Sequence, residues 1–173
     1  MNADVHFIRR RRLSASALVG ASAALLTAAC HRPPATPPDA LRGIVKTVGT
    51  ARVSELVLQR TTPDNALVSL RAAASDAAAL ARVAGTVVAV RGEFRGADTL
   101  IVSSFRVVEV DGQQVIDGVV RQENAHLSVC PPSSACVALG NPPDALRTLV
   151  GARVWFGGPP ATGPNTFGVI APR

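Results

Sequence analysis

The segment Ser75–Val90, SDAAALARVAGTVVAV, is the most informative about the fold, because its hydrophobic pattern changes period partway along. Residues 76–83 are rich in alanine, and the apolar residues Leu80 and Val83 are three residues apart. This spacing is typical of a short helix with one buried face. Gly85 ends this run, as glycine commonly does after a helix. Val88 and Val90 then alternate with other residues, as in a half-buried strand. The stretch therefore predicts one helix that leads into a β-strand.

Other β-type segments flank this stretch on both sides. Three precede the helix and two follow it, with the following residues: 43–48, 56–58, 66–70, 86–94 and 98–110. Turn residues separate them, including 63–65 and the Asp111-Gly112 pair. The order β-β-β-α-β-β resembles the OB-fold, a five-stranded, partly closed barrel. The resemblance implies a mainly β protein.

The C-terminal part of the chain repeats this order. From the helix onward one offset of 66 residues relates Leu80 to Leu146, Gly85 to Gly151, Val88 to Val154 and Gly92 to Gly158. Ser75 and Asn141 are the expected helix N-caps, with Pro142 at the first helical position. We expect an internal duplication into two OB-like modules, each a small partly closed barrel with one short helix, at 42–112 and 113–173. The alternative to a duplication is that two unrelated segments have the same residues because they form similar turns.

Both modules are expected to contribute to the hydrophobic core. Each is small enough that it buries only a marginal core by itself, so packing the two together adds stability. The expected core side chains are Leu80, Val88, Val90, Phe105, Leu146, Val154, Phe156 and Phe167.

The N-terminus has the pattern of an export signal. Arg9–Arg12 are followed by an apolar run without charged residues, and the run ends in Leu26-Thr27-Ala28-Ala29-Cys30. This ending resembles the lipobox of bacterial lipoproteins, which implies that residues 1–29 are a signal peptide and that Cys30 carries palmitate-type acyl chains. Such chains would hold the protein to a membrane. An ordinary secretory signal, with Cys30 as a thiol, is the alternative.

Residues 30–41 connect the lipid to the domain. Four prolines in this segment predict a stiff, extended tether. His31 follows the lipidated cysteine, and by the lipoprotein sorting rule a non-acidic residue there favours the outer membrane, facing the periplasm. Arg10–Ser14 loosely resembles a twin-arginine motif, so both export routes stay open.

Charge argues against a nucleic-acid partner. The whole chain has a net charge of +6, with 18 basic and 12 acidic residues. Removing residues 1–29 removes Arg9–Arg12 and Asp4, which leaves 14 basic and 11 acidic residues and a net charge of +3. That charge is ordinary for a soluble domain, and the few aromatic residues do not suggest a stacking platform.

Two further cysteines, Cys130 and Cys136, form an even pair in a chain that we expect to be exported. An oxidising compartment predicts a disulfide between them. β-type residues flank the Pro/Ser-rich segment that separates them, so the bridge would fasten a hairpin. A zinc site would need a second pair of ligands, such as His126 and another group, so no metal is expected.

Residues for catalysis are sparse in the exported part. His31 lies beside the lipid and His126 stands alone at a strand edge. Five acids near one strand pair are interpreted as solvated side chains rather than as a calcium site: Glu93, Asp98, Glu109, Asp111 and Asp117. The chain is therefore not expected to be an enzyme or to hold a cofactor.

The candidate binding surface is formed by Trp155 and Arg153. If Val154 and Phe156 point inward, Trp155 lies on the opposite face of the strand, where with Arg153 it would anchor a partner or fill the seam between the modules. We favour the seam for Trp155. The expected function is that of a non-enzymatic, lipid-anchored envelope protein that binds or scaffolds another envelope component. A periplasmic small-ligand-binding lipoprotein with a site between the modules is the alternative.

Overall fold

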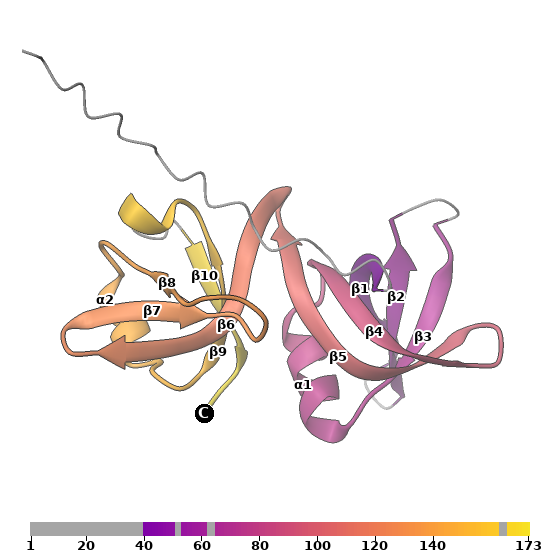
Figure 1. Ribbon diagram of the computed structural model, residues 1–173. Coiled ribbons are helices and arrows are strands. Elements are labelled where there is room, and N and C mark those ends of the chain that lie inside the picture. Colours follow the sequence, from indigo (N-terminus) through magenta and orange to yellow (C-terminus); the bar gives the residue numbers. More distant parts are fainter. Residues whose placement is uncertain (1–39, 51–52, 62–64, 163–165) are drawn as a thin grey trace, which may run out of the picture. The chain divides into compact units, whose positions relative to one another are not determined.

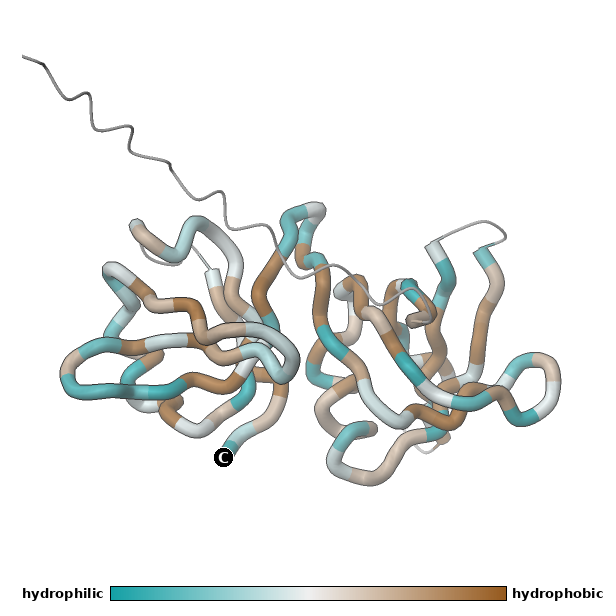
Figure 2. The backbone as a smooth tube through the Cα atoms, in the orientation of Figure 1, coloured by the Kyte–Doolittle hydropathy of each residue, from teal (hydrophilic) through white to brown (hydrophobic). Residues whose placement is uncertain are grey.

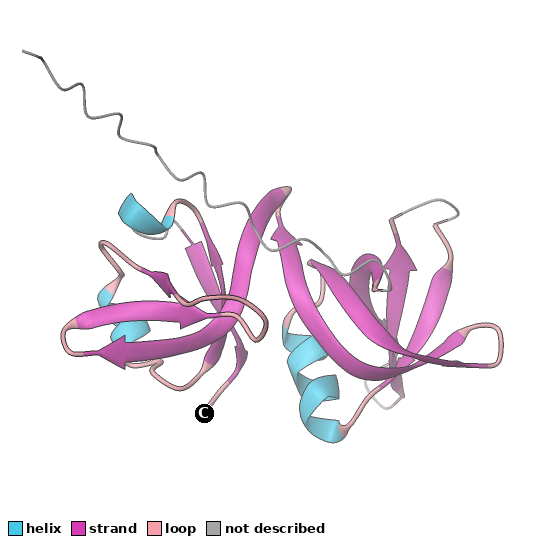
Figure 3. Ribbon diagram, in the orientation of Figure 1, coloured by secondary structure: helices cyan, strands magenta, loops and turns pink. Residues whose placement is uncertain are grey.

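The computed structural model describes residues 40–50, 53–61, 65–162 and 166–173. These residues belong to one compact unit that is mainly β, with two α-helices in the described part of the chain (Figure 1, Figure 3). The elements of the N-terminal part are β1 (Leu41–Gly49), β2 (Ser54–Arg60), β3 (Leu67–Arg71), α1 (Ala74–Arg82), β4 (Val87–Arg95) and β5 (Thr99–Val110). Their order is the β-β-β-α-β-β expected from the sequence.

Strands β1 to β5 form a closed five-stranded barrel, which we call the N-terminal barrel. β1 pairs in antiparallel fashion with β2 and β4, β2 pairs with β3, and β4 pairs with β5. The parallel pair of β3 and β5, in which Ser69 is aligned with Thr99, closes the circle. The expectation of a mainly β barrel is therefore confirmed.

The barrel interior contains the side chains that the alternation in β4 predicted. Val88 and Val90 are at most 1% exposed, and Leu80 of α1 is fully buried among them. Phe105 of β5 is 7% exposed in the same cluster. The helix is amphipathic, with Ala79 and Leu80 as its buried residues.

The remaining elements follow a turn at Asp111-Gly112, where both residues have positive φ. They are β6 (Gln113–Glu123), β7 (His126–Cys130), β8 (Val137–Ala138), α2 (Asp144–Arg147), β9 (Arg153–Gly157), η1 (Pro160–Thr162, a 3₁₀-helix) and β10 (Thr166–Ala171). We call residues 113–173 the C-terminal half. Its sheet has the order β8-β7-β6-β9-β10. Its own core includes Leu146, Val154 and Phe156, with Phe167 partly buried against them.

The expected helix caps are wrong in both places. α1 begins at Ala74, with Ala73 as N-cap and no side-chain cap, because alanine is the best helix former and Ala74 joins the helix ahead of Ser75. α2 begins at Asp144, after Pro143, and not at Pro142. The helical region is disfavoured for a residue that precedes proline, so Pro143 opposes a helix start at Pro142. Asn141 is therefore not a cap.

Side chains from the C-terminal half complete the core of the barrel. Val115 of β6 and Ile170 of β10 are 6% and 0% exposed, and both belong to the cluster that contains Leu80 and Val90. β6 also pairs with the end of β5, where Val110 is aligned with Gln113. Hydrophobic residues are concentrated in the strands and hydrophilic ones at the hairpin tips (Figure 2). The expected division into modules at 112 stays a prediction.

No helix within the described residues is long and apolar enough to cross a membrane. The expected signal peptide at 1–29, the lipid site at Cys30 and most of the tether at 30–41 lie outside the described residues, as does most of the turn expected at 63–65.

Candidate functional site

Trp155 occupies the middle of β9. Its neighbours Val154 and Phe156 are 0% and 1% exposed and face the core of the C-terminal half. Trp155 therefore lies on the opposite face of the sheet, where it packs, half-buried, against the cluster of the N-terminal barrel. The indole therefore lies in the seam between the barrel and the C-terminal half, the position that we favour from the sequence.

Gly168 of β10 makes room for the indole. It is aligned with Trp155 across the β9–β10 pair. A Cβ atom at Gly168 would lie 2.6 Å from Cε2 and 2.8 Å from Cζ2 of Trp155, which is closer than van der Waals contact permits. The missing side chain thus allows the indole to lie flat across the neighbouring strand.

Arg153, at the start of β9, forms an ion pair with Asp117 of β6. Its Nε donates to Oδ1 of Asp117 at 2.8 Å, and its Nη2 donates to Oδ2 at 2.8 Å. The side chain of Asp117 is 2% exposed and that of Arg153 is 21% exposed. Two parallel charge-assisted hydrogen bonds of this kind fix the orientation of both groups.

The pair also binds the backbone of β5. The Val107 N–H donates to Oδ2 of Asp117 at 2.8 Å, and Nη2 of Arg153 donates to the Phe105 carbonyl oxygen at 2.6 Å. The guanidinium lies 4.5 Å from the centre of the Phe105 ring, a favourable cation–π distance. Asp117 and Arg153 therefore bond backbone groups of β5 that a neighbouring strand would otherwise bond.

Arg106 lies in the same electrostatic neighbourhood. Burial lowers the pKa of its guanidinium, the nearby charge of Asp117 raises it, and the like charges of Arg91 and Arg42 lower it further. Arginine remains protonated despite such shifts. The site is therefore a network of charged side chains that hold one another in a fixed orientation.

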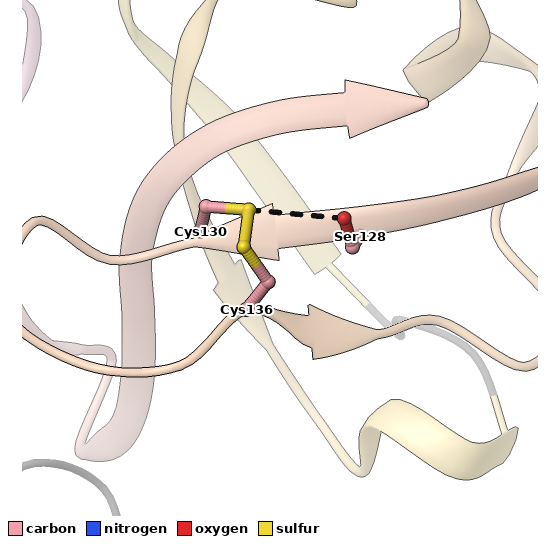
Figure 4. The surroundings of a disulfide bond; sticks show 3 residues. All are labelled: Ser128, Cys130 and Cys136. Carbon is pink, nitrogen blue, oxygen red and sulfur yellow. Dashed lines mark hydrogen bonds between the residues drawn. A yellow bond between two sulfur atoms is a disulfide. The ribbon is translucent and has the colours of Figure 1, made fainter. Parts of the chain in front are cut away.

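The expected disulfide is present between Cys130 and Cys136 (Figure 4). It joins the last residue of β7 to the residue that precedes β8. β7 and β8 pair with each other, and Val129 is aligned with Val137. The Ser128 hydroxyl lies 3.8 Å from Sγ of Cys130. The bridge fastens the hairpin, as the sequence predicted.

The other candidate side chains are not brought together. His126 is exposed on β7 and aligned with Glu123 across the hairpin. Glu109 pairs with Arg42 at 2.7 Å, while Asp117 turns inward to Arg153. Among the residues that the structure describes, no three His, Cys, Asp or Glu side chains could jointly hold a metal ion.

The role of Asp117 was missed in the sequence, where it was interpreted as one of five solvated acids. It is the buried charged residue among those described. A usable signal was present, because Asp117 is a single acid within an otherwise apolar or glycine run, Val115–Val120. An acid that is buried in this way needs a cationic partner, although the sequence does not indicate which arginine supplies it. As a partner-binding surface, Trp155 and Arg153 stay a prediction.

Comparison with known proteins identifies no relative. No family model matches the chain, and neither does any curated protein or any solved structure.

Proposed function

We propose that this chain is a non-enzymatic, lipid-anchored protein of the bacterial cell envelope, whose β domain binds or scaffolds another envelope component. The observation that carries the binding role is the position of the exposed apolar side chains. Among the described residues, the large hydrophobic side chains that are exposed all belong to the N-terminal barrel and its connections: Val48, Val53, Leu67, Phe94 and Ile101.

These side chains lie on the elements that an OB-like barrel uses for binding. In that fold the face of strands 2 and 3 and the loops between strands 1 and 2 and strands 4 and 5 contact ligands. Val53, which is 75% exposed, lies between β1 and β2; Leu67, 58% exposed, begins β3; and Phe94, 54% exposed, lies beside the β4–β5 turn. Exposed aromatic and aliphatic side chains are what a protein partner would bury. The fold alone is an analogy, so the exposed side chains are the stronger support.

Anchoring rests on the sequence around Cys30. It is tested by replacing Cys30 with alanine in cells, because the acyl chains would attach to this thiol. We expect the wild-type chain in the membrane fraction and the Cys30→Ala variant outside it. A Cys30→Ala variant that stays in the membrane fraction refutes lipid anchoring.

Binding is tested by photo-crosslinking in cells. A photoreactive amino acid replaces Phe94 or Leu67, and the matched control replaces Arg82, which is exposed on α1. We expect a discrete protein adduct from positions 94 and 67 but not from 82, with the adduct identified by mass spectrometry. Folded variants that give no adduct from 94 and 67, or the same adducts from all three positions, contradict the binding role.

We further propose that the C-terminal half is a duplicate of the barrel's fold. In the barrel, the Gly85 N–H bonds the Val45 carbonyl oxygen at 2.8 Å; in the C-terminal half, the Gly151 N–H bonds the Val120 carbonyl oxygen at 2.9 Å. Both glycines have positive φ, +92° and +89°.

The strand registers support the same equivalence. Gly43 is aligned with Val88, and Gly118 is aligned with Val154. Val90 is aligned with Phe105, and in the same way Phe156 is aligned with Phe167. The offset of 66 therefore relates residues that have the same neighbours in space, although it does not extend to the helix caps.

A further inference from the structure

The net positive charge of the exported chain is concentrated on three adjacent strands. β1, β4 and β5 contain two acidic residues and five basic ones: Glu93 and Glu109, and Arg42, Lys46, Arg91, Arg95 and Arg106. This excess of three equals the whole net charge of residues 30–173, which is +3. The rest of the exported chain is therefore neutral overall.

Most of these basic side chains share the outer face of the barrel. Arg91 follows the buried Val90, and Arg106 lies between the buried Phe105 and Val107, so both point away from the core. Arg42 and Arg106 are each aligned with Ala89, from β1 and from β5, and therefore lie in one row across β4. Arg95, aligned with Thr99, is exposed further along β4. We call Arg42, Arg91, Arg95 and Arg106 the arginine face.

The arginines lie close enough to influence one another. Burial is the largest influence on the pKa of Arg106 and lowers it; the charge of Asp117 raises this pKa, and the like charges of Arg91 and Arg42 lower it. Glu109 neutralises Arg42 only in part, because the side chain of Arg42 stays 42% exposed in their ion pair. β1, β4 and β5 together keep an excess of three positive charges, so a surface of opposite charge would attract this side of the barrel.

The arginine face also lies where the tether enters the barrel. β1 begins at Leu41, eleven residues after Cys30, and Arg42 is its second residue. Eleven residues span at most about 40 Å when fully extended. If Cys30 is acylated, β1 is therefore held within this distance of the bilayer surface, and anionic phospholipids attract nearby basic residues.

We propose that the arginine face docks the barrel onto the anionic phospholipid headgroups of the membrane that holds its anchor. This inference rests on the proposed lipid anchoring. Docking would orient the barrel at the surface, so that the acyl chains determine the attachment and the arginines determine which side of the domain faces the bilayer.

The test measures vesicle binding without the lipid anchor. Full-length chain carrying Cys30→Ala is mixed with phosphatidylglycerol/phosphatidylcholine vesicles or with pure phosphatidylcholine vesicles. The test variant adds Arg91→Gln and Arg95→Gln. The matched control adds Arg82→Gln and Arg121→Gln, which remove the same charge from exposed positions on α1 and β6. Arg9–Arg12 are common to all variants, so the difference between the two variants reports on the arginine face alone.

We expect binding to anionic vesicles to fall at least about tenfold for Arg91→Gln/Arg95→Gln and to change little for the control. The difference should shrink in high salt, which screens exposed charges. Equal effects of the two pairs, or equal binding to both kinds of vesicle, overturn the proposal. The vesicle experiment uses protein without an acyl chain, so its result does not depend on lipid anchoring. Lipid anchoring is tested separately, by fractionation of cells with Cys30→Ala. Circular dichroism confirms that each variant is folded.

Discussion

Arg153 on β9 and Asp117 on β6 form a two-point ion pair whose N–O distances are both 2.8 Å, and each partner also bonds the backbone of β5. The pair therefore joins three strands, two from the C-terminal half and one from the N-terminal barrel. Its position beside Phe105 and Val107 places it at the seam where Trp155 packs. The consequences of this arrangement can be measured.

Replacing Asp117 with alanine should strongly destabilise the protein. The guanidinium of Arg153 and the Val107 N–H would lose their acceptor in a largely buried place, and breaking one side of such a pair costs about 3 kcal/mol or more. Urea denaturation measures this loss. The matched control is Glu109→Ala, which breaks the more exposed Arg42–Glu109 pair and should cost less than about 1 kcal/mol. Similar losses for the two variants would mean that Asp117 does not stabilise the seam.

The C-terminal strand should stabilise the barrel as well as its own sheet. Ile170 of β10 is fully buried in the barrel cluster, so Ile170→Ala should lower the free energy of unfolding by about 3 kcal/mol. Val169→Ala, at the partly buried neighbour, serves as control and should cost less. A barrel that keeps its wild-type stability in Ile170→Ala would show that β10 is dispensable for it.

Cutting the chain after Gly112 should give two fragments that fold poorly. The N-terminal fragment would lose Val115 and Ile170 from its core, and the C-terminal one would expose Trp155, which packs against that core. Circular dichroism and urea titration of each fragment test this expectation. Two fragments that unfold cooperatively by themselves would instead establish independent domains.

Removing the disulfide should destabilise the protein modestly. The loop between Cys130 and Cys136 is short, with a sequence separation of 6, and the chain-entropy model gives about 2 kcal/mol for its closure. We expect this loss for Cys130→Ser/Cys136→Ser in urea denaturation. Wild-type protein measured in reductant should unfold at the same urea concentration as the double variant; a lower midpoint for the variant alone would point to a packing role for the sulfur atoms.

The proposed duplication predicts where a second disulfide can form. Val129 and Val137 are aligned next to the Cys130–Cys136 bridge, and in the barrel Leu58 and Val68 are aligned next to Gln59 and Leu67. Gln59→Cys/Leu67→Cys should therefore close a bridge, seen as a mass loss of two hydrogens without reductant. Gln59→Cys/Ser69→Cys is the control, because Ser69 is aligned with Val57. If the first pair stays reduced under conditions that oxidise Cys130 and Cys136, the two hairpins are not equivalent.

Local structure could be predicted from the amino-acid pattern. The change from helical to alternating spacing between Leu80 and Val88 set the helix, the following strand and their buried side chains, because burial follows from periodicity along one segment. The cysteine pair likewise lies within one hairpin, so its neighbours in sequence were enough to place it. The helix caps failed for a local reason as well: the conformational limits that Pro143 imposes on Pro142 outweighed the capping preference of Asn141.

Contacts between segments far apart in the chain could not be predicted in this way. The apolar run around Asp117 indicates that this acid is buried, but its cationic partner is hidden in the sequence, because Arg153 lies 36 residues further along and the backbone of β5 completes the site. The contribution of Val115 and Ile170 to the barrel core was equally hidden, since an apolar residue in a strand is expected to be buried but the sequence does not indicate against which element. Burial is encoded locally by the spacing of apolar residues, whereas the partner of a buried charge depends on how the strands are arranged in space.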